Sequence, residues 1–138
     1  MRSLVVEDTR VIQMILEKLL EPYGECLVAK NGAEAIDAFH RAFGEKRPFD
    51  LVCLDIGLPD LDGREVLSKI RAIEEVRGVQ KGQKVPVIAI TAASDTATVR
   101  SVVEMGDGYI VKPVNREKLV ENLVRLGLIP PTPDGTHG

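Results

Sequence analysis

The sequence predicts an α/β protein whose five parallel strands form one doubly wound sheet, with five helices covering its two faces. Three observations indicate this fold class. Short apolar runs alternate with helical stretches from one end of the chain to the other, which is the pattern of βα units. The runs are almost continuously apolar, as expected for strands that are buried on both faces. Gly and Pro punctuate the segments between them.

The spacing of apolar residues and the residues that end helices give the individual elements. We expect strands at 3–6, 25–29, 50–54, 85–90 and 109–111, and helices at 9–20, 31–43, 64–76, 94–105 and 115–126. Asn31 and Glu34 have the spacing of a capping box at the start of the second helix. Gly44 can cap the end of that helix, and Gly127 ends the last one.

Length, charge and composition exclude several classes of protein. The 138 residues suffice for one domain, which we assign to 1–127, followed by a Pro-rich flexible tail at 128–138. A net charge of −3 without a dense basic run argues against nucleic-acid binding. Cys26 and Cys53 lie in apolar stretches, which favours buried reduced thiols. The sequence shows no signal peptide and no apolar run of the ~20 residues that span a membrane, so we expect a cytoplasmic protein.

Polar residues recur where the predicted strands end. Glu7 and Asp8 follow the first strand, Asp55 follows the third, Thr91 the fourth and Lys112 the fifth. In open parallel sheets, ligands bind at the carboxyl ends of the strands, near a topological switch point. We therefore expect these side chains to lie together at one edge of the sheet.

The chemistry of this set favours a divalent cation and a phosphoryl group. Three neighbouring carboxylates repel one another, and the single ammonium group of Lys112 cannot balance them. Carboxylate oxygens suit Mg²⁺ better than they suit a soft metal. A carboxylate can also attack phosphorus to form an aspartyl phosphate. Mg²⁺, Lys112, the Thr91 hydroxyl and backbone N–H groups could then stabilise the phosphoryl oxygens.

Four segments of the sequence resemble the receiver domains of two-component response regulators. These segments are 4–8 (Leu-Val-Val-Glu-Asp), 51–63 (Leu-Val-Cys-Leu-Asp-Ile-Gly-Leu-Pro-Asp-Leu-Asp-Gly), 88–92 (Ile-Ala-Ile-Thr-Ala) and 109–113 (Tyr-Ile-Val-Lys-Pro). The resemblance extends from about Leu4 to Leu126. It implies the flavodoxin-like receiver fold with strand order 2-1-3-4-5.

The resemblance also implies which residues bind the metal. Asp55 is the expected phosphoacceptor and, with Asp8, a direct ligand of Mg²⁺. The backbone carbonyl of Gly57 is the third protein ligand, and Glu7 binds through water.

The same resemblance implies a role for the residue after the fifth strand. Lys112 pairs first with Asp55 and then with the phosphoryl group, and the Lys112–Pro113 bond is cis.

Thr91 and Tyr109 are the switch residues that the resemblance implies. Thr91 hydrogen-bonds the phosphoryl group, and the Tyr109 ring turns inward as Thr91 moves.

Purely structural roles stay open as alternatives for several of these residues. Tyr109 can be a half-buried strand aromatic, and Glu7 and Asp8 can cap the first helix. Asp60 and Asp62 fit loop and cap positions.

The favoured function is a phosphorylation-dependent binding switch. We do not expect an enzyme: the domain would catalyse only its own Mg²⁺-dependent phosphorylation and dephosphorylation. The expected donor is a histidine kinase or a His phosphotransfer protein. A downstream protein would bind the face formed by the fourth helix, fifth strand and fifth helix. This arrangement is similar to a stand-alone, chemotaxis-type receiver, which we expect to be a monomer, although that face could also form a dimer.

Several other functions can be weighed on the same residues. A phosphorelay intermediate or phosphate sink needs the same chemistry and stays open. An aspartyl phosphatase needs a second acid two residues after the nucleophile, where this chain has Gly57. A nucleotide-binding module needs a phosphate-binding loop after the first strand, where Glu7 and Asp8 place negative charge instead. A degenerate scaffold would have lost one of the key residues, and none is lost.

Overall fold

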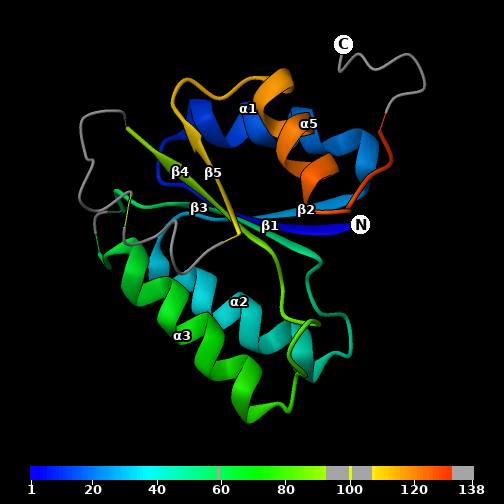
Figure 1. Ribbon diagram of the computed structural model, residues 1–138. Helices are drawn as coiled ribbons and strands as arrows, with labels where there is room; N and C mark the ends of the chain where they lie inside the picture. The colour runs from blue at the N-terminus through cyan, green and yellow to red at the C-terminus, as the bar shows by residue number, and fades with distance from the viewer. Residues whose placement is uncertain (59, 93–99, 101–106, 132–138) are drawn as a thin grey trace.

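The computed structural model of the protein describes residues 1–58, 60–92, 100 and 107–131 (Figure 1). In chain order the elements are β1 (Arg2–Val6), α1 (Arg10–Leu20), the 3₁₀ turn η1 (Glu21–Tyr23), β2 (Glu25–Ala29), α2 (Gly32–Gly44), β3 (Leu51–Asp55), α3 (Gly63–Val76), β4 (Val87–Thr91), β5 (Gly108–Val111) and α5 (Arg116–Arg125). The helix expected at 94–105, apart from residue 100, and the tail beyond residue 131 lie outside the described residues.

The five strands form one parallel sheet in the order β2-β1-β3-β4-β5, as predicted. Figure 1 shows α2 and α3 on one face of the sheet and α1 and α5 on the other. The register places Val5 beside both Val28 and Cys53, and Ile90 beside Ile110. Strand order reverses direction between β1 and β3, because the chain goes from β1 outward to β2 and then returns. The switch point of the sheet therefore lies between β1 and β3.

The core has two halves, one on each face of the sheet, because successive strand side chains point to opposite faces. Strand side chains on one face of the sheet pack against α2 and α3. This half of the core contains Leu4, Val6, Val52, Leu54, Val87 and Ala89 with Phe39, Leu67 and Ile70. Strand side chains on the opposite face pack against α1 and α5. This half contains Val5, Leu51, Cys53, Ile88, Ile90 and Ile110 with Leu16, Leu20, Leu119 and Leu123. The half beside α2 and α3 contains the phenylalanines Phe39 and Phe49, whereas the buried residues of the other half are aliphatic apart from Cys53.

Two strands extend one residue further than predicted, and this moves two site residues into the sheet. Asp55 is the last residue of β3 and Thr91 the last of β4. The ladder continues past each of them, since Ile56 N–H donates to Ile90 O (3.1 Å) and Lys112 N–H donates to Thr91 O (2.8 Å). Their backbones are therefore held as firmly as the rest of the sheet.

The ends of α2 differ from the prediction in detail. Asn31 Oδ1 accepts from Glu34 N–H (2.8 Å), but Glu34 Oε1 accepts from Lys30 N–H (3.1 Å) and not from Asn31. The prediction that Gly44 caps the helix was wrong, because the left-handed residue is Lys46, with φ of +59°. Gly127 does adopt a left-handed conformation after α5, with φ of +75°.

The start of the predicted tail belongs structurally to the domain. Leu128 and Ile129 pack against the half of the core that lies under α1 and α5. Across the described part of the chain, no helix has the combination of length and apolar character that a bilayer crossing requires.

Candidate functional site

The polar residues that the sequence placed at strand ends lie together at the carboxyl edge of the sheet. Glu7, Asp8 and Asp55 each have a carboxylate oxygen within 4.8 Å of the others. Lys112 follows β5, and its Nζ lies 3.5 Å from Asp55 Oδ2 and 4.0 Å from Glu7 Oε2. Two of the three carboxylates are buried, with Glu7 0% and Asp55 4% exposed, whereas Asp8 faces solvent. The predicted convergence of these four side chains is therefore present in the structure.

Glu7 is held by its backbone and by one carboxylate oxygen. Its N–H donates to Ala29 O (3.0 Å), and its Oε1 accepts from Thr9 N–H (3.1 Å). Its carbonyl oxygen accepts from the Gln13 side-chain amide, Nε2, at 2.6 Å. The second oxygen, Oε2, is buried and receives no hydrogen bond from the described residues. One acceptor atom therefore points into the acidic cluster without a hydrogen-bond donor.

Burial and the neighbouring Asp55 carboxylate raise the pKa of Glu7 from its ordinary value of 4.5 to about 7. Desolvation is the largest cause, because a buried carboxylate loses its hydration. Lys112 acts in the opposite direction but is the smallest of the contributions. In the absence of a further cation, Glu7 is therefore partly protonated at neutral pH.

Asp55 is placed between a backbone donor and a cation. Its Oδ1 accepts from Gly57 N–H at 2.9 Å, and its Oδ2 faces the Lys112 ammonium group. A Cβ atom built on Gly57 would lie 3.5 Å from Asp55 Oδ1, which is an ordinary van der Waals distance. Lack of space beside Asp55 therefore does not explain the small residue at position 57.

Thr91 and Tyr109 lie on the two strands at the β5 side of the sheet. The Thr91 hydroxyl is buried, and Oγ1 donates to Ala92 O at 3.1 Å. Tyr109 lies beside Ala89 in the register, and its side chain is 48% exposed. The described contacts thus place the Tyr109 ring at the surface, as both the switch interpretation and the strand-aromatic alternative allow.

Lys118 is a site neighbour that the sequence analysis missed. Its ammonium group, Nζ, donates to Val111 O (2.9 Å) and to Pro113 O (3.1 Å), the carbonyls on either side of Lys112. The intervening Lys112–Pro113 bond is cis, as the resemblance implied. Nothing in the sequence signals this contact, because it depends on how α5 packs against the loop after β5.

The acidic residues after Asp55 are caps, as the sequence suggested for loop and cap positions. Asp62 accepts from Arg64 N–H (2.8 Å) at the start of α3. Asp60 accepts from Gly32 N–H (2.9 Å) and Ala33 N–H (3.0 Å), and these bonds lower its pKa. Asp60 therefore ties the loop after β3 to the start of α2, a long-range contact that spacing alone does not reveal.

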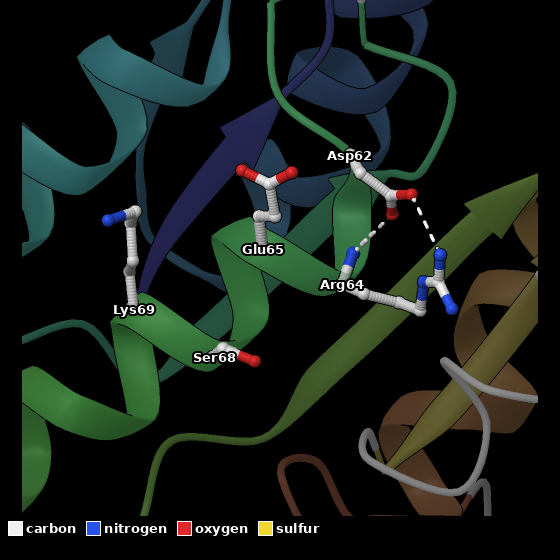
Figure 2. Close-up of a pocket in the computed structure, with 5 residues that line it drawn as sticks. All are labelled: Asp62, Arg64, Glu65, Ser68 and Lys69. Carbon is white, nitrogen blue, oxygen red and sulfur yellow. Dashed lines mark hydrogen bonds and ion pairs between the residues drawn. The ribbon is translucent and has the colours of Figure 1, made fainter.

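A shallow hollow of about 480 Å³ lies on the first turns of α3 and is separate from the acidic cluster. Figure 2 shows its lining residues, Asp62, Arg64, Glu65, Ser68 and Lys69, with Arg64 paired to Asp62. The lining has both signs of charge and contains none of the residues predicted for the site.

The donor set of the acidic cluster fits a hard divalent cation. Among the described residues it combines three carboxylates, one of which has a buried oxygen without a hydrogen-bond donor, with the ammonium group of Lys112. Oxygen-rich sites with room for water are those that Mg²⁺ prefers. The cluster found among the described residues contains none of the thiolate or imidazole ligands that softer metals favour.

The sheet order and the acidic edge together are those of the flavodoxin-like receiver fold. Residues 3–124 match the response regulator receiver domain, so the chain belongs to this family of two-component signalling domains. Receiver domains of this family are phospho-accepting switches rather than classic enzymes. The family that the four sequence segments indicated is thereby confirmed.

Curated relatives with a similar segment include large sensor proteins. A probable histidine kinase of Oryza sativa is 33% identical over 132 residues, which cover 88% of this chain and 12% of the relative. The sensor histidine kinase GacS of Pseudomonas protegens is 31% identical over 126 residues, covering 90% of this chain and 13% of the relative. The chain thus spans about one eighth of the length of these relatives.

Solved receiver structures have the same fold. A CheY-like receiver domain protein of Methanospirillum hungatei is 29% identical with a TM-score of 0.70, covering 92% of each chain. A Pseudomonas aeruginosa sensor-kinase receiver domain, crystallised with a magnesium ion in its active-site cleft, is 29% identical with a TM-score of 0.71, over 90% of this chain and 94% of that one. A Saccharomyces cerevisiae receiver domain co-crystallised with a histidine phosphotransfer protein is 28% identical with a TM-score of 0.74, over 92% and 88%.

Proposed function

We propose that this receiver domain accepts a phosphoryl group on Asp55 and thereby changes how it binds a partner protein. The observation that carries the proposal is the position of Asp55. Its buried carboxylate lies between the Gly57 N–H (2.9 Å) and the Lys112 ammonium group (3.5 Å), inside a cluster of three acids. A nucleophile at such a site attacks phosphorus while fixed donors stabilise the negative charge on the phosphoryl oxygens.

The same cluster supports Mg²⁺ binding. Asp8, Asp55 and the Gly57 carbonyl would hold the ion directly, and Glu7 would hold it through water. When bound, Mg²⁺ neutralises the carboxylates and the phosphoryl oxygens. The magnesium ion in the Pseudomonas aeruginosa receiver domain supports this assignment. The buried Oε2 of Glu7 supports it independently, because a water bound to the ion would supply the hydrogen-bond donor that this oxygen lacks.

The phosphoryl donor in this proposal is a phosphohistidine. One Asp55 oxygen forms the new P–O bond while the P–N bond breaks and its electron pair stays on the ring nitrogen; with a proton on the other ring nitrogen, the donor histidine leaves as a neutral imidazole. Lys112 stays charged and stays next to the new acyl phosphate. Hydrolysis of that acyl phosphate returns Asp55 to its carboxylate form, so the domain promotes only its own phosphorylation and dephosphorylation.

Thr91 and Tyr109 are the proposed switch pair. The Thr91 hydroxyl donates to Ala92 O, a weak local bond that it can exchange for a phosphoryl oxygen. Rotation of the Thr91 side chain toward the phosphoryl group would leave space next to β5. The Tyr109 ring, which is half exposed, could then move into that space. A charge change at one side chain can bias a two-state element in this way. The downstream target would bind near β5 and α5, together with the segment expected to form the fourth helix.

A phosphorelay role is the second candidate, and the comparisons favour keeping it. The histidine-kinase relatives contain this segment as a small part of a longer chain. The yeast receiver domain was co-crystallised with a histidine phosphotransfer protein. The same Asp55 could thus pass its phosphoryl group to another histidine.

The cytoplasmic location and the monomeric state stay predictions from the sequence.

Beryllofluoride, which mimics a phosphoryl group, tests the switch directly. We expect its addition with Mg²⁺ to shift the amide NMR signals of Asp55, Thr91 and Tyr109 in the wild type. In Thr91→Ala, the shift at Asp55 should persist and the shift at Tyr109 should shrink. A Tyr109 signal that responds equally in both proteins would contradict the proposed link.

The decay of the acyl phosphate distinguishes the binding switch from the phosphorelay role. Rapid return of the phosphoryl group to an added phosphotransfer histidine favours the relay.

A further inference from the structure

We infer that Gln13 is a positioning residue for the cation site, because its side-chain amide fixes the turn between β1 and α1 that presents Glu7 and Asp8. The inference rests on the proposed function, since it concerns how well that site binds Mg²⁺. It concerns a residue that touches neither the metal nor the phosphoryl group.

Gln13 occupies an unexpected place on α1. The side chain is 7% exposed and lies on the buried face of the helix with Leu16 and Leu20. Two apolar residues of the same helix, Val11 and Met14, are instead more than half exposed. Burying a side-chain amide is unfavourable unless its polar atoms are hydrogen-bonded. The position of Gln13 therefore needs a compensating contact.

The compensating contact is made with Glu7. Gln13 Nε2 donates to the Glu7 carbonyl oxygen at 2.6 Å in a buried setting. At the other end of the amide, Gln13 Oε1 accepts from Arg10 Nη1 at 3.3 Å. The guanidinium can only donate, so this second bond orients the amide with its NH₂ group toward Glu7. Both ends of the side chain are thus satisfied.

This hydrogen bond orients two acidic residues at once. The Glu7 carbonyl belongs to the rigid peptide plane that also contains the Asp8 nitrogen and Cα. Glu7 N–H is held separately by Ala29 O at 3.0 Å. With both sides of Glu7 fixed, its Oε2 points toward Asp55 and Lys112, and Asp8 leaves the turn in a set direction. Groups outside the ligand set that orient the ligands contribute strongly to metal affinity.

The substitution Gln13→Met tests the inference, because it keeps the length and volume of the side chain but removes the donor. We expect the Mg²⁺ dissociation constant, measured by isothermal titration calorimetry, to rise about tenfold. The rate of phosphorylation by acetyl phosphate should fall at low Mg²⁺ and return to the wild-type maximum at saturating Mg²⁺. Gln13→Asn, whose amide is one methylene too short to reach the Glu7 carbonyl, should show the same weakening.

Leu16→Val is the matched control. It lies on the same buried face of α1 and lowers stability without touching the Glu7 carbonyl. The inference is overturned if Gln13→Met and Gln13→Asn bind Mg²⁺ like the wild type, or if Leu16→Val loses as much affinity at a similar loss of stability. A wild type that binds no Mg²⁺ overturns the proposed function and the inference together, so the two failures are distinguishable.

Discussion

Glu7 and Asp55 are buried acids at a distance where both cannot be charged without a cost, and Lys112 lies within 4.0 Å of each. Removing charge from water is unfavourable, and like charges make it more so. The cluster resolves this in one of two ways. Glu7 takes up a proton, or a divalent cation neutralises the acids. The two alternatives compete, so pH and Mg²⁺ should act on the same residue.

The raised pKa of Glu7 predicts how the stability of the Mg²⁺-free protein depends on pH. Its pKa is about 7 when folded and near 4.5 when unfolded, so the folded state binds more protons between these values. The contribution of this group to the free energy of unfolding should therefore be fully present below about pH 4.5 and be lost as pH rises through 7, by roughly 3 kcal/mol in total. Urea unfolding in EDTA between pH 5 and 8.5 measures the change.

Glu7→Gln is the control for that pH dependence, because its amide does not titrate. The slope between pH 5 and 8 should flatten in this variant. Added Mg²⁺ should also reduce the slope in the wild type, since the ion favours the deprotonated carboxylate. An equal slope in the wild type and in Glu7→Gln would assign the effect to another group and contradict the account.

At the scale of elements, the loop after β3 and the start of α2 fit together closely. A Cβ atom at Gly32 would lie 2.9 Å from Leu61 Cδ1 and 2.9 Å from Val66 Cγ2, distances that require these side chains to shift. Asp60 adds the two hydrogen bonds to Gly32 and Ala33. The loop that leads away from Asp55 is therefore positioned by α2 as well as by α3.

Two glycines of α2 give a matched pair of substitutions. Gly32→Ala should lower the free energy of unfolding by about 1–3 kcal/mol, because it overpacks the contact with Leu61. Gly44→Ala should raise it by about 0.5–1 kcal/mol, because Ala is the better helix former and nothing lies within 4 Å of the added methyl group. Urea titrations of both variants measure the two effects. A destabilised Gly44→Ala variant would contradict the assigned helix end.

The sequence was sufficient to predict the order of the described strands and helices and the convergence of the polar strand-end residues at one edge of the sheet, whereas their roles in phosphorylation stay predictions. Apolar runs mark the strands, and the polar residues at their ends follow from the parallel topology. The contacts of Gln13, Asp60 and Lys118 were not predictable, because each joins segments whose relative placement depends on packing. The end of α2 was misassigned because the helix continues through Gly44, and the backbone hydrogen bonds that close it, from Lys46 N–H to Phe43 O and from Arg47 N–H to Ala42 O, put the left-handed position at Lys46.

At the scale of the whole molecule, the edge of the sheet opposite the site carries a separate polar network. Buried Glu74 of α3 accepts from Val85 N–H (2.6 Å) and pairs with Arg71 (2.8 Å). Arg71 also pairs with Asp107, whose Oδ2 accepts from Val87 N–H. The network fastens the starts of β4 and β5 to α3. Stability and chemistry thus depend on opposite edges of one sheet.

This separation predicts that the network can be damaged without affecting the site. Glu74→Ala leaves Arg71 and the Val85 N–H without their buried partner, and should lower the free energy of unfolding by about 3 kcal/mol. The Mg²⁺ dissociation constant of the folded protein should stay within about twofold of the wild-type value, since distant sites are close to independent. A large loss of Mg²⁺ affinity in the folded variant would show that the two edges are coupled.

The central claim is that Asp55 is the phosphoacceptor, and intact mass spectrometry tests it most directly. The wild type and Asp55→Asn are each incubated with Mg²⁺ and acetyl phosphate. The account predicts a gain of one phosphoryl group by the wild type and none by Asp55→Asn, whose side chain has the same shape but is a poor nucleophile. An equal gain in both proteins, or no gain in either, would contradict the claim.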